Sequence, residues 1–137
     1  MMKYLLLPVL AFIAWSCNNQ QDSYTKATDA QDAGREFIRA SLDGDLKKAK
    51  FYMLKDSANL DLLETWKKKH YDKRSSEERR QYREAQIRPV SIQPVNDSLV
   101  NYIYTNSFKE KDTTVLSVVK VGDEWLVDFK QVHSWKH

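Results

Sequence analysis

The hydrophobic period of this chain changes once, at Ile87. In residues 28–86 apolar side chains recur every three or four positions, the spacing of an amphipathic helix. In residues 87–132 apolar and polar side chains alternate, the spacing of a strand with one buried face. The strand segments are joined by short turns with no room for crossovers, so their sheet should be antiparallel. The sequence therefore predicts an α+β fold, with N-terminal helices packed on one face of an antiparallel sheet of about four strands.

The helical half divides at residues suited to helix ends. Thr28 and Gln31 form a capping box that opens a first helix, and Gly44 can take the left-handed conformation that ends it. Asp45 can cap a second helix. Ser75 offers a capping box for a short surface helix. The second, third and fourth helices are expected at residues 46–54, 59–71 and 77–86.

Turn chemistry divides the other half into strands. Pro89 and Pro94 cannot donate to a ladder, so the first strand belongs at an edge or at bulges. Residues 109–112 are predicted to form a charged turn. Gly122-Asp123 is a two-residue connection typical of a tight hairpin before the last strand.

The start of the chain has the features of a secretory signal. An uncharged run, residues 4–15, follows Lys3 and is too short to cross a bilayer as a helix, which takes about 20 residues. The run ends at the small residue Ser16, directly before the only cysteine, Cys17. Ala14-Trp15-Ser16-Cys17 resembles a bacterial lipoprotein signal, in which the cysteine receives acyl chains such as palmitate. A plain secretory signal and a true membrane anchor are the alternatives.

Three parts follow from this interpretation: a lipoprotein signal peptide at residues 1–16, the lipidated Cys17 with a flexible polar tether at 17–27, and a single domain at 28–137. The chain would lie in the cell envelope, held to a membrane at the periplasmic or outer-membrane face. Because Cys17 is the only cysteine, no disulfide can form within the chain and burial must stabilise it. The formal net charge is only +3, and nucleic acid is a poor partner outside the cytoplasm.

Two segments carry a family resemblance. Phe37-Ile38-Arg39-Ala40-Ser41-Leu42-Asp43-Gly44-Asp45-Leu46 and Gly122-Asp123-Glu124-Trp125-Leu126-Val127-Asp128 are similar to small Bacteroidetes-type lipoproteins of the nuclear-transport-factor-2-like (cystatin-like) superfamily, including lumazine-binding-like domains of unknown function. The start Cys17-Asn18-Asn19 is similar to lipoproteins of that group. The resemblance implies a cone, in which a curved sheet wraps helices around a cavity. Some members use this cavity for catalysis, and many only bind.

Aromatic residues are the strongest sign of a binding site. Six of them could converge beneath a curved sheet, where aromatic walls with a few polar tips suit small ligands. They would serve an ordinary core equally well. The candidate ligand-binding residues are Tyr52, Trp66, Tyr102, Tyr104, Trp125 and Phe129.

Catalytic and metal chemistry have weaker support. Asp128 could act as a base if its face of the last strand lined the cavity, because burial raises a carboxyl pKa, as in the ketosteroid isomerase of this superfamily. It could equally lie in water beside Lys130. His70, His133 and His137 are scattered, and two ligands make a poor zinc site, so no metal is predicted. The chain has only three glycines and no phosphate-binding loop, so no cofactor is predicted.

The sequence favours a non-catalytic binding domain on an envelope lipoprotein. Its ligand would be a small apolar or heteroaromatic molecule, or a partner envelope protein. One alternative is an isomerase or hydratase that uses a buried Asp128. Another is a structural docking module that uses the basic segment 67–88, with Lys67, Lys68 and Arg79 in contact with the partner.

Overall fold

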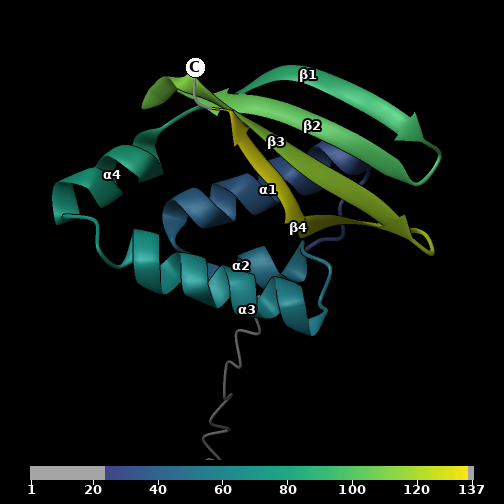
Figure 1. The fold of residues 1–137 in the computed structure, drawn as a ribbon, viewed down its shortest axis with the longest axis horizontal. Coiled ribbons are helices and arrows are strands. Elements are labelled where there is room, and N and C mark those ends of the chain that lie inside the picture. Colours follow the sequence, from purple (N-terminus) through teal and green to yellow (C-terminus); the bar gives the residue numbers. More distant parts are fainter. Residues whose placement is uncertain (1–23, 136–137) are drawn as a thin grey trace, which may run out of the picture.

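The α+β prediction is confirmed. The computed structural model of the chain describes residues 24–135, which form helices followed by a curved antiparallel sheet (Figure 1). The elements in order are α1 (Ala30–Asp43), α2 (Leu46–Phe51), α3 (Ser57–Trp66), the π-helix η1 (Lys67–Tyr71), α4 (Ser76–Glu84), β1 (Ile87–Asn96), β2 (Leu99–Asn106), β3 (Lys109–Val121) and β4 (Glu124–Trp135).

The four strands pair in chain order, each antiparallel to the next. Helix α1 lies beneath the sheet, α2 and α3 lie farther from it, and α4 extends to one side (Figure 1). Strand β1 is an edge strand, and its register shifts between Pro89 and Ser91 and again between Pro94 and Asn96. The prediction from the prolines is therefore confirmed, because both lie on an edge strand at irregular positions.

Helix α1 is fixed at both ends by local chemistry. Its N-cap is Asp29 rather than Thr28, because the Asp29 carboxylate accepts the N–H of Asp32 at 2.7 Å. The Asp32 carboxylate in turn accepts the N–H of Thr28 at 3.0 Å. Asp29 and Asp32 therefore take the places in the capping box that were predicted for Thr28 and Gln31. The C-cap is Gly44 with φ +73°, as predicted.

Helix α2 is shorter than expected and ends at Phe51 instead of residue 54. The chain turns there to run beside β4, where the N–H of Leu54 donates to the Val127 carbonyl and the N–H of Val127 donates to the Tyr52 carbonyl, both at 2.8 Å. These two hydrogen bonds pair residues 52–54 with β4 in the parallel direction, so the same backbone groups cannot continue the helix. They also occupy part of the outer edge of β4.

The expected third helix begins and ends differently. The side chain of Asp56 accepts the N–H of Asn59 at 2.8 Å and caps α3, which therefore begins at Ser57. The α-helix ends at Trp66, and a π-helical turn, η1, continues to Tyr71. Such turns are rare and often occur at functional sites.

The predicted charged turn at residues 109–112 is wrong. The Asn106 side chain accepts the N–H groups of Phe108 and Lys109, at 3.0 and 2.9 Å, and so closes the turn earlier. Residues 109–112 therefore begin β3. The Gly122-Asp123 hairpin is confirmed, since Val121 pairs with Glu124.

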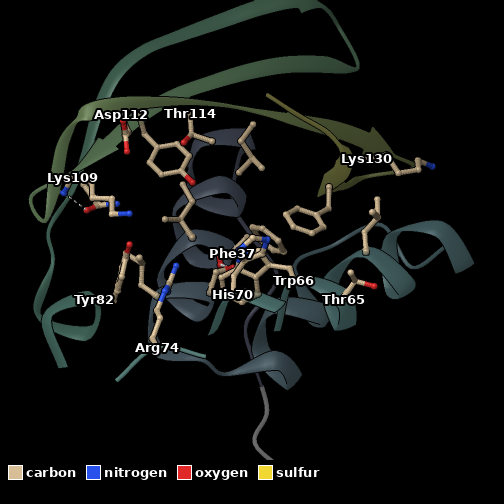
Figure 2. Close-up of a pocket in the computed structure, with 18 residues that line it drawn as sticks. Phe37, Thr65, Trp66, His70, Arg74, Tyr82, Lys109, Asp112, Thr114 and Lys130 are labelled. Atoms are coloured by element: carbon tan, nitrogen blue, oxygen red, sulfur yellow. Dashed lines mark hydrogen bonds between the residues drawn. The ribbon is translucent and has the colours of Figure 1, made fainter. Parts of the chain in front are cut away.

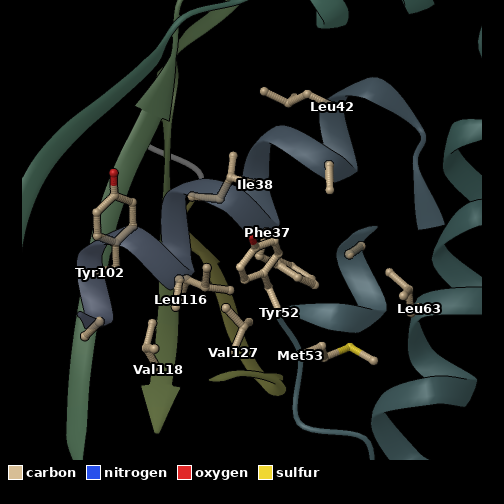
Figure 3. Packing of buried hydrophobic residues seen from close by; sticks show 14 of the residues in the cluster. Phe37, Ile38, Leu42, Tyr52, Met53, Leu63, Tyr102, Leu116, Val118 and Val127 are labelled. Carbon is tan, nitrogen blue, oxygen red and sulfur yellow. The ribbon is translucent and has the colours of Figure 1, made fainter. Parts of the chain in front are cut away.

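The core lies between α1 and the concave face of the sheet (Figure 3). Gly34 lets α1 approach the sheet, because a Cβ there would lie 3.3 Å from Cγ of Tyr102. The largest fully buried side chains are Tyr102, Met53, Leu63, Leu116, Val118, Val127 and Asn59.

The packed part of the chain extends before Thr28. The ring of Tyr24 lies 5.4 Å from that of Phe51, and the Thr25 carbonyl accepts a hydrogen bond from the Tyr52 hydroxyl at 2.7 Å. The last residues of the expected tether therefore contact α2 and its C-cap. The signal peptide and Cys17 lie outside the described residues. Within residues 24–135, no helix is both long and apolar enough to cross a membrane.

Candidate functional site

An open cavity of about 570 Å³ lies between the sheet, α1 and the α3–η1 segment (Figure 2). Helix α1 supplies its floor, β2, β3 and β4 supply one wall, and α3 with η1 supplies the other. Tyr82 of α4 borders one end. The cavity is thus formed by segments far apart in the sequence, which the fold brings together around a shared opening.

Aromatic rings form much of the lining. Phe37 of α1 and Phe129 of β4 lie with ring centroids 5.7 Å apart, tilted by 53°. Trp66, at the end of α3, faces the same space. Aliphatic side chains complete the apolar surface: Ile38, Leu42, Leu62 and Leu116. A surface of this kind favours a flat or otherwise apolar molecule.

Tyr104 brings a neutral hydroxyl to the cavity. Burial raises the pKa of its hydroxyl to about 12, while the neighbouring Thr114 hydroxyl opposes the shift. Both residues line the cavity, on the paired strands β2 and β3. At neutral pH the Tyr104 side chain is therefore an uncharged group that can donate or accept a hydrogen bond.

The charged residues lie at opposite ends. Figure 2 shows Arg74, Tyr82, Lys109 and Asp112 toward one end and Lys130 toward the other. The Arg74 guanidinium carbon lies 3.7 Å from the centroid of the Tyr82 ring, a close cation–π contact. The positive charge of Lys130 is balanced within the domain, because its ammonium pairs with Asp56 and lies 3.9 Å from Asp128.

Three of the six predicted aromatic residues, Trp66, Tyr104 and Phe129, line the cavity. The other three lie elsewhere. Tyr102 is fully buried between the sheet and α1, and Tyr52 is 5% exposed and donates a hydrogen bond to the Thr25 carbonyl. Trp125 is partly buried against the core, with the Lys120 ammonium 5.8 Å from its ring.

Sequence reasoning missed the cations of the cavity and Phe37. Phe37 lies in the expected first helix, in a segment that carries the family resemblance, and nothing in its spacing indicates a cavity. Arg74 falls in the basic segment 67–88, between two expected helices, and Lys109 falls in the expected turn at 109–112. The close packing of Arg74 on Tyr82 and the burial of its Nη1 atom distinguish it from a surface charge.

Asp128 lies apart from the cavity lining. Its side chain is 13% exposed, and Oδ1 accepts a hydrogen bond from Asn59 Nδ2 at 3.1 Å. The nearby Lys130 ammonium adds a weaker electrostatic contact at 3.9 Å. Among residues 24–135, the carboxylate that lines the cavity is that of Asp112, which is exposed.

The basic segment is partly engaged within the domain. Lys67 pairs with Asp72 at 2.9 Å, and Arg79 donates to the Asp72 carbonyl at 2.8 Å. The Arg79 guanidinium also lies 5.1 Å from the Tyr71 ring. Lys68 is exposed. The surface offered by this segment is therefore less basic than its sequence indicates.

The described part of the chain contains no group of three His, Cys, Asp or Glu side chains placed to hold a metal ion. His70 is exposed and lines the cavity, whereas the side chains of His133 and His137 lie outside the described residues.

The resemblance to nuclear-transport-factor-2-like lipoproteins predicted a curved sheet around helices with a cavity between them, and the fold has this arrangement (Figure 1). The prediction that the protein is a lipoprotein depends on Cys17, which lies outside the described residues. Family membership stays a prediction from the residues. In comparisons with known proteins, no family model, no curated protein and no solved structure matches this chain.

Proposed function

We propose that this domain binds a small molecule with an aromatic or other apolar body in the cavity beneath the sheet, and that binding rather than catalysis is its function. The observation that carries the proposal is the open cavity of about 570 Å³ with aromatic walls. Ligand sites in proteins have volumes of about 300–1,000 Å³ and apolar linings with a few polar groups. This cavity has both properties.

The composition of the walls supports an apolar ligand. The buried Phe37 packs against Phe129, and Trp66 and Phe129 line the cavity with partly exposed rings that water solvates poorly. Covering them with an apolar molecule gains about 25 cal/mol for each Å² removed from water. Tyr104 and Thr114 would then fix the orientation of a polar atom on the ligand.

The placement of Asp128 favours binding over acid–base chemistry. Its carboxylate is held by Asn59 and lies away from the cavity lining. A general base must lie within hydrogen-bond reach of the proton it removes. We place the domain in the cell envelope, anchored through lipid on Cys17, as its leader sequence indicates.

The test fills the cavity with a larger side chain. Thr114 lines the cavity on β3, a strand position that accepts an aromatic residue, and Thr114→Trp would occupy the ligand space. Thr113→Trp is the matched control, because neighbouring strand residues point to opposite faces of the sheet. Binding of the neutral probe 2-naphthamide to the full-length chain is measured by equilibrium dialysis.

The proposal predicts that 2-naphthamide binds the wild-type chain and the Thr113→Trp variant with similar affinity. Thr114→Trp should weaken binding by about tenfold or more. Far-ultraviolet circular dichroism shows whether each variant is folded. Equal binding to folded Thr114→Trp and wild-type protein would contradict the proposal, as would no binding to either.

A further inference from the structure

We propose that the ligand of this cavity carries a carboxylate, which binds at the end of the cavity formed by Arg74, Lys109 and Tyr82. The inference rests on the proposed function, since it concerns the same cavity. It concerns the chemical class of the ligand: an apolar body with one negative charge, rather than a neutral apolar molecule.

Arg74 is the first observation. Its Nη1 atom is buried, and no group within residues 24–135 accepts a hydrogen bond from it. A buried donor without an acceptor is destabilising, and more so when the group is charged. A bound anion beside the guanidinium would offset this cost electrostatically, and the exposed part of the group could donate to it directly.

The position of Arg74 is set before any ligand arrives. Its guanidinium stacks on Tyr82 at 3.7 Å and lies 5.9 Å from the Trp66 ring. Tyr82 is itself buried on α4. A planar guanidinium held in this way loses little freedom when it binds a carboxylate, and its fork matches the two carboxylate oxygens.

Other arginines of the domain show what Arg74 lacks. Arg35 pairs with Asp32 at 2.7 Å, and Arg80 pairs with Glu84 at 3.0 Å. Within the described part of the chain, Arg74 has no carboxylate within 4.0 Å. Its positive charge therefore faces the cavity without a carboxylate counter-ion among the described residues.

The second observation is the basic character of this end. A smaller hollow of about 370 Å³ adjoins the cavity and shares His70, Arg74, Tyr82 and Lys109 with it. Lys69 and Lys73 border this hollow as well. Its negative residues are fewer: Glu78 lines the hollow and Asp112 lines the cavity, and both are exposed. This balance favours a singly charged anion.

The opposite end is electrically different. Lys130 is paired with Asp56 there, so it offers little net charge to a ligand. Phe37 lies between the two ends in Figure 2, and Phe129 lines the cavity beside it, with the ring centroids 5.7 Å apart. A ligand with its apolar body against this pair of rings and its carboxylate toward Arg74 would match both chemistries.

The experiment compares two probes of the same shape. 2-Naphthoate carries a carboxylate, whereas 2-naphthamide has a neutral amide in the same place. Equilibrium dialysis of the full-length chain measures both affinities for wild-type protein and for Arg74→Gln. Arg83→Gln is the matched control, because it removes an exposed arginine of α4 that does not line the cavity.

The inference predicts that wild-type protein binds 2-naphthoate more tightly than 2-naphthamide. Arg74→Gln should weaken naphthoate binding about tenfold and leave naphthamide binding nearly unchanged. Arg83→Gln should change neither. Should Arg74→Gln fold poorly, Lys109→Gln tests the same end, with a smaller expected loss of naphthoate affinity.

The two hypotheses fail in different ways. If Thr114→Trp blocks both probes, but the ratio of their affinities is the same in wild-type protein, Arg74→Gln and Lys109→Gln, the carboxylate inference is wrong and the cavity still binds ligand. If Thr114→Trp changes the binding of neither probe, the proposed function itself is wrong.

Discussion

Asn59 of α3 holds Asp128 of β4 through its amide nitrogen, which donates to Asp128 Oδ1 at 3.1 Å. The Asn59 Oδ1 atom accepts the N–H of Lys130 at 2.9 Å. The pairing of β4 with β3 is irregular at this point, between Val115 and Ser117. The fully buried Asn59 side chain therefore supplies a partner for a backbone N–H where the ladder is interrupted.

We expect Asn59→Ala to lower the free energy of unfolding by about 3 kcal/mol, because it removes two buried hydrogen bonds and leaves their partners unsatisfied. Urea denaturation measures the change. Asn101→Ala is the control: its amide is partly exposed and makes one contact, with Ser117 Oγ at 3.2 Å. Equal losses in the two variants would show that Asn59 has no special structural role.

Arg39 of α1 holds the C-terminal end of α4. Its guanidinium donates to the carbonyls of Tyr82, Arg83 and Ala85 at 3.1, 2.9 and 2.7 Å. Carbonyls at a helix end have no partners within the helix, and a cation there is favourable. Arg39 also pairs with Asp43 at 3.1 Å.

Arg39→Gln should therefore destabilise the fold by about 2 kcal/mol. Arg35→Gln removes an arginine from the preceding turn of the same helix, whose side chain is 58% exposed and pairs with Asp32. Its loss should cost less than about 1 kcal/mol. Thermal and urea unfolding compare the two. A result in which Arg35→Gln costs as much as Arg39→Gln would refute this role for Arg39.

The raised pKa of Tyr104 predicts that the folded protein becomes less stable at high pH. Its pKa rises from 10.0 to about 12 because burial disfavours the phenolate. Between these values the unfolded chain loses the proton and the folded chain keeps it, so stability should fall as the pH rises through this range. Burial also raises the pKa of Tyr102, which adds a loss of the same sign.

Tyr104→Phe should make stability less sensitive to pH in that range, as measured by urea unfolding at the two ends. The absorbance of tyrosinate in the folded protein should also lose one late-titrating group. Tyr71→Phe is the control, because the Tyr71 hydroxyl is close to the surface and makes a 3.3 Å contact with the Asp43 carbonyl. An identical loss of stability in wild-type protein and Tyr104→Phe would contradict the assignment.

Lipidation can be tested independently of the cavity. Cys17→Ser should move the protein from the membrane fraction to the soluble fraction, because the acyl chains have no other attachment point in the proposed anchor. Asn19→Ser, two residues later, should leave the protein with the membranes. If Cys17→Ser stays in the membrane fraction, the lipid anchor is wrong.

The parts of the fold that the sequence predicted have local causes. Gly44 ends α1 because its φ of +73° suits glycine, and Gly122 with φ +63° begins a two-residue turn. Pro89 and Pro94 mark an edge strand because they lack the N–H that a ladder needs. Each of these signals acts within a few residues, so a single sequence is enough to find it.

The site depends on contacts that the local pattern does not contain. Tyr102 and Tyr104 share one face of β2, yet the Tyr102 side chain packs against Gly34 of α1, whereas Tyr104 lines the cavity. The alternation of apolar and polar residues predicts which face of the sheet a side chain lies on. It does not predict whether the helix covers that side chain or leaves it open to the cavity. The clamp of Arg39 on α4 joins residues more than forty positions apart and has no spacing signature.

Native mass spectrometry tests the central claim most directly, with the full-length chain purified from the envelope of cells that produce it. We predict a non-covalent small-molecule adduct on wild-type protein and on Thr113→Trp, lost from Thr114→Trp, in which the cavity is filled. The same adduct on folded Thr114→Trp, or no adduct on wild-type protein, would contradict the claim that this cavity holds a ligand.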